Sequence, residues 1–357
     1  MDLEWSLRRG QLARQGACPG ASLLLRASGF QAVLLAAFGG PESPEEVMPF
    51  LERVVVGRKI LPSRLEEVAT HYHHCGGRSP VNDHNRALEV ELAGVGLDWP
   101  VYLGNRNWHP YFEETLVRMR EDGIGRALAL FTTPYGSYPG CRQYLEDLER
   151  ARATVGEGAP ELVRVRSYFD HPGFIQASIE RTRQALESLP EVERPGARLV
   201  FTAHNLPLAM ARTSPYVGQL RLACSLVAEA LGRPDWNLVF QSRSGPSGQP
   251  WLEPDLLDFL QGLPGTEAVL LSPIGFLSDH VEVLWDLDVE AAELCRGRGL
   301  SFRRAATVGV HSSFVRGLRQ LLEESARPGS PVLKLQPEAF EHRTCGAECC
   351  RMPSRAY

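Results

Sequence analysis

Short apolar and β-branched runs alternate with longer amphipathic stretches from residue 32 to about residue 325. Apolar runs of this length that end in turn residues are typical of buried strands. The predicted strands are Ala32–Phe38, Val101–Gly104, Ala127–Thr132, Leu162–Arg166, Leu199–Ala203, Leu238–Gln241, Ala268–Ser272 and Phe302–Ala305. The stretches between them predict helices, among them Pro44–Val54, Glu113–Glu121, Arg142–Ala153, Phe174–Ser188, Val217–Leu231 and Val281–Arg296. This alternation indicates an α/β fold in which helices cover both faces of parallel sheets.

The predicted strands divide into two groups of four, and the polar segment Glu191–Ala197 is a plausible linker between them. We therefore expect two Rossmann-like, doubly wound halves, each with a four-stranded parallel sheet, and a cleft between them. The predicted boundaries are an N-terminal extension at 1–30, the two halves at 31–190 and 191–330, and a cysteine-rich tail at 331–357. Ligands of such sheets bind beyond the carboxyl ends of the strands. The residues that follow each strand are therefore the candidates for chemistry.

Composition excludes several classes of function. The net charge of −5 comes without a sustained basic run, so no nucleic acid partner is expected. No apolar stretch approaches the roughly 18 residues of a membrane-spanning helix, and the apolar segment before Arg26 is too short for a secretory signal. We expect a cytoplasmic protein. Its first 30 residues are either a poorly ordered extension or the result of a misassigned start. The signatures of hydrolases, P-loop enzymes and dinucleotide enzymes are absent, so no nucleotide cofactor is expected.

Three carboxylates, Glu282, Asp286 and Glu290, recur every four residues in one predicted helix. On an α-helix this spacing drifts by about 40° per step, which places them in one stripe roughly 12 Å long. Carboxylate oxygens suit a hydrated divalent cation, so the stripe could pass an ion along while removing its water. The alternative is a solvated acidic face on an exposed helix.

His204 follows a predicted strand directly and precedes a turn set by Pro207. Imidazole is the side chain best suited to act as a base near neutral pH or as a metal ligand. The alternative is a histidine held at a strand end by backbone hydrogen bonds alone.

Two other groups of possible metal ligands stand out. His71, His73, His74, Cys75 and His84 are close in sequence, but they lack the usual spacing of a zinc site. Three of the eight cysteines, Cys345, Cys349 and Cys350, crowd the tail. Clustered thiols in a cytosolic chain favour a metal or iron–sulfur site over disulfides, although a frayed tail is the alternative. Three thiolates need a fourth from elsewhere in the chain.

Several blocks of sequence resemble the signature blocks of the ferrochelatases, in a consistent order over residues 32 to 325. The blocks are Phe38–Pro41, Gly76–Pro80, Gly104–Tyr111, Phe201–Pro207, Gln241–Gly245, Pro250–Pro254 and Pro273–Asp288. The resemblance implies the chelatase fold, with a porphyrin bound in the cleft between two Rossmann-like halves. It implies insertion of ferrous iron, as substrate, into a porphyrin during haem synthesis, without a nucleotide.

The resemblance also assigns roles to residues. His204 matches the family's essential histidine, which takes pyrrole protons or binds the metal, and Glu282 matches the opposed carboxylate. Asp286 and Glu290 continue the metal path. Tyr72, Ser79 and Tyr144 fall where residues that line the porphyrin site lie in related enzymes, and Arg58 is a further candidate for a propionate partner.

The block Asn105–Trp108 and the segment Gly136–Tyr144 look most like the actinobacterial type, whose members use coproporphyrin III. Protoporphyrin IX is the second candidate substrate. Some members of this type also hold a [2Fe–2S] cluster on one internal and three tail cysteines. The resemblance therefore implies Cys141 as the internal ligand, with Cys345, Cys349 and Cys350. The adjacent pair is unusual, because both thiolates must turn toward one cluster.

Two alternatives to iron insertion stay open. The first is a chelatase that inserts cobalt or nickel in another tetrapyrrole pathway. The second is a non-catalytic haem or iron–sulfur sensor on the same scaffold, which would not need both His204 and Glu282. The sequence makes no prediction of oligomeric state.

Overall fold

The computed structural model describes residues 29–57, 60–245, 248–265, 268–327, 329–336, 345–346 and 348–353. The predicted N-terminal extension lies almost entirely outside the described residues, and so does Arg58. No helix among the residues described is both long and apolar enough to cross a membrane.

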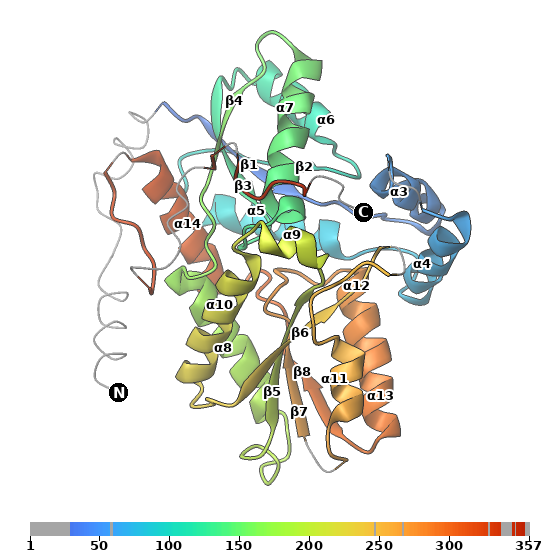
Figure 1. The fold of residues 1–357 in the computed structure, drawn as a ribbon. Helices are drawn as coiled ribbons and strands as arrows, with labels where there is room; N and C mark the ends of the chain where they lie inside the picture. The colour runs from blue at the N-terminus through green and yellow to red at the C-terminus, as the bar shows by residue number, and fades with distance from the viewer. Residues whose placement is uncertain are drawn as a thin grey trace.

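Two four-stranded parallel sheets form the framework, one above the other in Figure 1. The first sheet has the order β2-β1-β3-β4 and the second has the order β6-β5-β7-β8. The strands are β1 (Ala32–Ala37), β2 (Val101–Asn105), β3 (Arg126–Phe131), β4 (Glu161–Arg164), β5 (Arg198–His204), β6 (Trp236–Gln241), β7 (Ala268–Ser272) and β8 (Ser301–Arg304). Both sheets thus have the same order of strands along the chain. The predicted α/β fold with two such sheets is confirmed.

Helices cover both faces of each sheet. Along the first half they are η1 (Pro44–Glu46), α3 (Val47–Val54), α4 (Pro62–His74), α5 (Val81–Gly94), α6 (Phe112–Glu121), η2 (Tyr138–Arg142), α7 (Gln143–Val155) and α8 (Pro172–Glu187). Along the second half they are α9 (Leu208–Arg212), α10 (Tyr216–Ala230), α11 (Leu256–Gly262), α12 (Val281–Val283), η3 (Leu284–Ala291), α13 (Ala292–Gly297) and α14 (Ser312–Ala326). The central strand β1 is buried over its whole length, as expected of a strand covered on both sides.

The last helix of each half packs on the sheet of the other half. Helix α8 contacts β7 and β8, and α14 contacts β3 and α5, so each crosses over (Figure 1). The two helices meet at Gly173 and Gly317, where a Cβ on Gly317 would lie 2.9 Å from the Cα atom of Gly173. Side chains from both sheets and both helices consequently form one continuous hydrophobic core.

The predicted helix over Val281–Arg296 is present, but its middle is not α-helical. The segment η3 is a π-helix, in which hydrogen bonds close wider turns than in an α-helix. The prediction that the three carboxylates form one even α-helical stripe is therefore wrong for Asp286 and Glu290, because both lie on the wider turns. Neighbouring residues hold this segment from two sides, since Trp285 stacks on His71 at 4.1 Å and Arg304 donates to both oxygens of Asp288 at 2.6 and 2.7 Å.

Candidate active site

His204 is the last residue of β5, and its backbone is fixed by the neighbouring strand. It lies in register with Gln241, the last residue of β6, and Asn205 N donates to the Gln241 carbonyl at 2.7 Å. The hydroxyl of Tyr216 donates to the His204 carbonyl at 3.0 Å. His204 Nδ1 lies 2.6 Å from the Asn205 carbonyl oxygen. Because a carbonyl only accepts, Nδ1 carries a proton, and Nε2 of the neutral ring has the free lone pair.

Glu282 faces the Nε2 atom of His204. The loop after β7 leads into α12, and Glu282 is the second residue of this helix. Its Oε2 atom lies 3.5 Å from His204 Nε2, and the two side chains keep 46% and 33% of their surface exposed. The sequence had placed both residues beyond the ends of strands, and the structure brings them together from different strands of the second sheet.

The pair is electrostatically coupled. Burial among protein atoms favours the neutral ring, but the Glu282 carboxylate outweighs it and raises the pKa of His204. Burial likewise opposes the charge on Glu282, but the His204 charge and hydrogen bond outweigh it and lower the pKa of Glu282 to about 2. Each group thus favours the charged form of the other.

Asp286 continues the line of acids from Glu282. Burial raises the pKa of Asp286 to about 7, and the charges of Glu282 and Glu290 add to this shift. Two donors at the end of β6 oppose it, since Gln241 Nε2 donates to Asp286 Oδ2 at 3.1 Å and the Ser242 hydroxyl donates to the same oxygen. Burial also raises the pKa of Glu290. The three carboxylates form an electrostatically connected set. Gln241 and Ser242 are partners that the motif alone did not reveal.

Tyr72 approaches this set from the first half of the chain. Burial, followed by the charge of Glu282, raises its pKa far above the usual range. Its ring packs 5.9 Å from Phe50. On the same helix, His71 stacks on Trp285 and His74 meets the same indole edge-on at 5.1 Å. These two histidines therefore make ring contacts across the two halves. No group of three or more His, Cys, Asp or Glu side chains suited to a metal ion is found in the described part of the chain.

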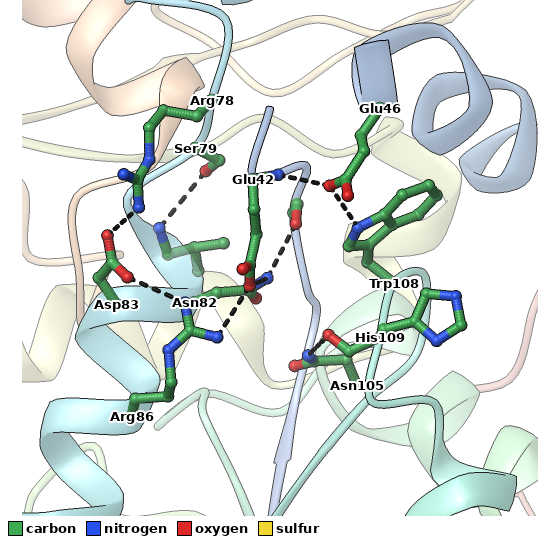
Figure 2. Close-up of polar contacts among 12 residues, drawn as sticks. Glu42, Glu46, Arg78, Ser79, Asn82, Asp83, Arg86, Asn105, Trp108 and His109 are labelled. Carbon is green, nitrogen blue, oxygen red and sulfur yellow. Dashed lines mark hydrogen bonds and ion pairs between the residues drawn. The ribbon is translucent and has the colours of Figure 1, made fainter. Parts of the chain in front are cut away.

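Hydrogen bonds fix the loop that follows β1, as Figure 2 shows. Asn82 Nδ2 donates to the Gly40 carbonyl at 2.8 Å and to Glu42 Oε1 at 2.7 Å. Glu46 Oε2 accepts from the Glu42 backbone N–H and from Trp108 Nε1, both at 2.8 Å. The loop is therefore held from α5 on one side and from the segment after β2 on the other.

Ser79 belongs to the support of this loop. It is buried, with 3% of its surface exposed, and its backbone N–H donates to the Pro41 carbonyl at 2.8 Å. A Cβ on Gly40 would lie 2.8 Å from Ser79 Cβ, so the loop passes close to this serine.

Tyr144 lies in the core beneath the first sheet. It is 5% exposed, its ring packs 5.2 Å from Phe131, and the guanidinium of Arg106 covers it at 4.9 Å. Arg106 also lies 5.8 Å from the ring of Phe38, which is 40% exposed. The largely buried Arg106 thus contacts the rings of both Tyr144 and Phe38.

Cys141 and the tail cysteines Cys345, Cys349 and Cys350 lie near one another beside η2, without forming a group of three or more side chains suited to a metal ion. Cys141 and Cys350 are buried in the same hydrophobic cluster, and Cys349 packs against it. Cys345 and Cys350 both exchange hydrogen bonds with the Cys141 thiol, and the Cys349 and Cys350 sulfur atoms are 3.8 Å apart. Cys350 has a φ of +51°, a left-handed turn that allows adjacent thiols to face the same side.

Comparison with known proteins agrees with this arrangement. The ferrochelatase family model matches residues 30–326. The chain belongs to the ferrochelatase family. The enzyme is a lyase that inserts ferrous iron into a porphyrin in haem synthesis, as the resemblance had implied.

Two relatives and one solved structure illustrate the similarity. The ferrochelatase of Rhodopirellula baltica is 46% identical over 328 residues, covering 90% of this ferrochelatase and 93% of the relative. The coproporphyrin III ferrochelatase of Mycolicibacterium smegmatis is 50% identical over 333 residues, covering 90% and 98% of the two chains. SirB from Bacillus subtilis with Fe3+ is 14% identical with a TM-score of 0.50, covering 83% of this chain and 97% of SirB. That likeness supports the fold alone.

Proposed function

We propose that this enzyme inserts Fe2+ into coproporphyrin III, with His204 and Glu282 facing the metal as it enters the macrocycle. The observation that carries the proposal is the 3.5 Å approach of His204 Nε2 to Glu282 Oε2, with Asp286 continuing the acidic line. The choice of coproporphyrin III rests on the relatives of that name, such as the one from Mycolicibacterium smegmatis.

The chemistry is a proton-for-metal exchange without a change of oxidation state. The free porphyrin carries two pyrrole N–H bonds; both break, two protons leave, and four nitrogen atoms bind Fe2+. His204 is suited to exchange a proton at Nε2, because Nδ1–H is held by the Asn205 carbonyl and Nε2 faces the Glu282 carboxylate. Glu282, whose low pKa keeps it charged, attracts the cation and stabilises the imidazolium that forms.

We assign the metal path to Glu282, Asp286 and Glu290, and a porphyrin contact to Tyr72. The assignment of Tyr72 is supported by the influence of the Glu282 charge on the pKa of its phenol. The buried positions of Ser79 and Tyr144 favour an indirect role, in which they support the loop after β1 and Arg106. We retain the predicted division at 31–190 and 191–330 as the two halves of the enzyme.

We also propose a [2Fe–2S] cluster on Cys141, Cys345, Cys349 and Cys350. The fit rests on the donor set, because four thiols contact one another in pairs in a partly buried position. Arg164 Nη1 contacts the Cys345 sulfur and would offset thiolate charge there. When bound, such a cluster supplies one-electron redox chemistry and ties the tail to η2. All cysteines in the described residues are free, which agrees with a reducing compartment such as the cytoplasm.

The test is a side-by-side measurement of Fe2+ insertion into coproporphyrin III and protoporphyrin IX under anaerobic conditions. We expect a higher kcat/KM for coproporphyrin III. A preference for protoporphyrin IX would overturn the choice of substrate, and Co2+ or Ni2+ insertion without Fe2+ insertion would overturn the choice of metal.

A further inference from the structure

A small cavity lies between α8 and the carboxyl ends of β7 and β8. Its polar lining comes from Ser178 and Arg181 of α8, from Ser272 at the end of β7, and from Thr307 in the loop that follows β8. The other lining residues are apolar. The residues assigned above to the metal and the porphyrin do not line this cavity, so the proposed function does not account for it.

Arg181 brings a positive charge to the cavity without a carboxylate partner. Its side chain is partly buried, and its Nε atom is buried with no hydrogen-bond partner. Within the described residues the guanidinium forms no ion pair. The neighbouring carboxylate of Glu180 is engaged elsewhere, since it lies 3.0 Å from His311 Nε2 and accepts from Gln176. A buried donor on a charged group is costly to leave unpaired, so a ligand of opposite charge would be stabilised here.

Thr307 supplies a second donor. It is 5% exposed, and its hydroxyl forms no hydrogen bond with a described residue. The other hydroxyl protons nearby are already in use, because Ser178 donates to a carbonyl of its own helix. The Thr182 hydroxyl donates to the Ser178 carbonyl at 2.8 Å, so Ser272 is the donor in its 2.9 Å contact with Thr182. Arg181 and Thr307 therefore remain as donors for a ligand.

The size of the cavity limits what can bind. The volume open to the centre of a water-sized group is about 10 Å³, which is room for about one such group. This admits an anion of one atom and excludes phosphate or sulfate. We propose that the cavity binds a single halide ion, normally chloride, between the Arg181 guanidinium and the Thr307 hydroxyl. The bound ion joins α8 to the loops after β7 and β8, and it stabilises the folded chain by mass action. This site is independent of iron insertion.

The test compares the response of three variants to chloride. Arg181→Gln removes the charge, and Thr307→Val removes the hydroxyl. Arg183→Gln is the matched control, because it makes the same change on the same helix at a partly exposed position outside the cavity lining. The measurement is the thermal midpoint Tm in sodium chloride and in sodium gluconate at equal ionic strength, since gluconate is too large for the cavity. Diffraction from crystals of the unsubstituted enzyme grown in bromide locates the ion by its anomalous signal.

We expect chloride to raise the Tm of the unsubstituted enzyme and of Arg183→Gln along a saturating curve. Arg181→Gln should lose this response. Thr307→Val should need about tenfold more chloride for half of the shift, the usual effect of losing one hydrogen bond to a charged group. Bromide should lie between Arg181 and Thr307 in the crystal.

Equal chloride responses of Arg181→Gln and Arg183→Gln would overturn the inference. A peak in the cavity without an anomalous signal would also overturn it, because a water molecule would then satisfy Arg181. Bromide in the crystal without a chloride-dependent Tm would mean binding at crystal concentration only, which equally counts against the site. Should Arg181→Gln fail to fold, Thr307→Val and the diffraction experiment on the unsubstituted enzyme still decide the question.

Discussion

The Nε2 atom of His204 lies 3.5 Å from Oε2 of Glu282, which is longer than the 2.7–3.2 Å of a usual N–H···O hydrogen bond. The two groups therefore face each other as a long, electrostatically coupled pair. The position between them is bounded by an imidazole nitrogen on one side and a carboxylate oxygen on the other.

Replacing His204 by Ala should lower the rate of metal insertion by about 10²-fold or more, the usual contribution of a positioned base. Porphyrin binding, measured by fluorescence quenching, should remain. The matched control is His311→Asn, because His311 also pairs with a carboxylate, with Nε2 3.0 Å from Glu180 Oε2, but caps α14. Normal turnover by His204→Ala would refute the catalytic assignment.

The KM for the divalent metal should fall as pH rises through about 7. Asp286 has a pKa of about 7, so its carboxylate, the form that attracts a cation, becomes the major form above that pH. Asp286→Asn should raise the KM at pH 8 and remove this part of the pH dependence. The check is a series of Zn2+ titrations between pH 6 and pH 8.5. A pH profile identical in the variant would contradict the role of Asp286 in the path.

The enzyme produced anaerobically with iron and sulfide should be brown and should absorb visible light through sulfur-to-iron charge transfer. Cys345→Ser should lose this absorbance, because one thiolate ligand is removed. Cys75→Ser is the control, since Cys75 is a free, partly exposed cysteine on the C-terminal side of α4. A colourless preparation, free of iron and sulfide, would remove the cluster from the proposal.

Acid should destabilise the fold through His171. This residue is 1% exposed, accepts from the Gly173 N–H as the N-cap of α8, and burial lowers its pKa to about 3. The unfolded chain binds a proton to His171 below about pH 6.5 and the folded protein only below about pH 3, so stability is full above 6.5 and falls between these values. One such group changes the unfolding free energy by about 1.4 kcal/mol per pH unit.

His171→Asn keeps an acceptor at the N-cap and removes the titrating ring. Urea unfolding at pH 7.5, 6 and 5 should therefore show a weaker loss of stability in the variant than in the unsubstituted enzyme. His73→Asn, at an exposed position of α4, should keep the original slope. Equal slopes for all three proteins would show that other groups carry the acid sensitivity.

The sequence predicted the parts of the fold that depend on local pattern. Strand β7 has the predicted bounds and the other strands differ by two residues or fewer at each end, because buried apolar runs followed by turn residues define a strand locally. The convergence of His204 and Glu282 followed from the rule that parallel strands present their carboxyl ends at one edge. Family resemblance, rather than pattern, selected these two residues from many polar candidates.

Other features depend on contacts between distant residues, which no local pattern contains. The residues of η3 are compatible with an α-helix, and the π-helical turns accompany contacts of Trp285 with His71 and of Asp288 with Arg304. The left-handed backbone conformation of Ser242 could not be predicted, because the residue at this position is not a glycine. The burial of Ser79 and Tyr144 likewise arises from the packing of whole helices against the first sheet.

The crossing of α8 and α14 restricts how the enzyme can open for a flat substrate. Each helix completes the hydrophobic core beneath the opposite sheet. A wide rotation of one sheet against the other would therefore disrupt the core that the two halves share. For the same reason, a chain cut after residue 190 should yield two insoluble fragments, because each would expose its part of the shared core. The α3–α4 arm has a small hydrophobic cluster of its own, outside that interior. Rearrangement during entry and release of the macrocycle should therefore fall on this arm, while the second sheet, at whose edge His204 and Glu282 meet, stays fixed.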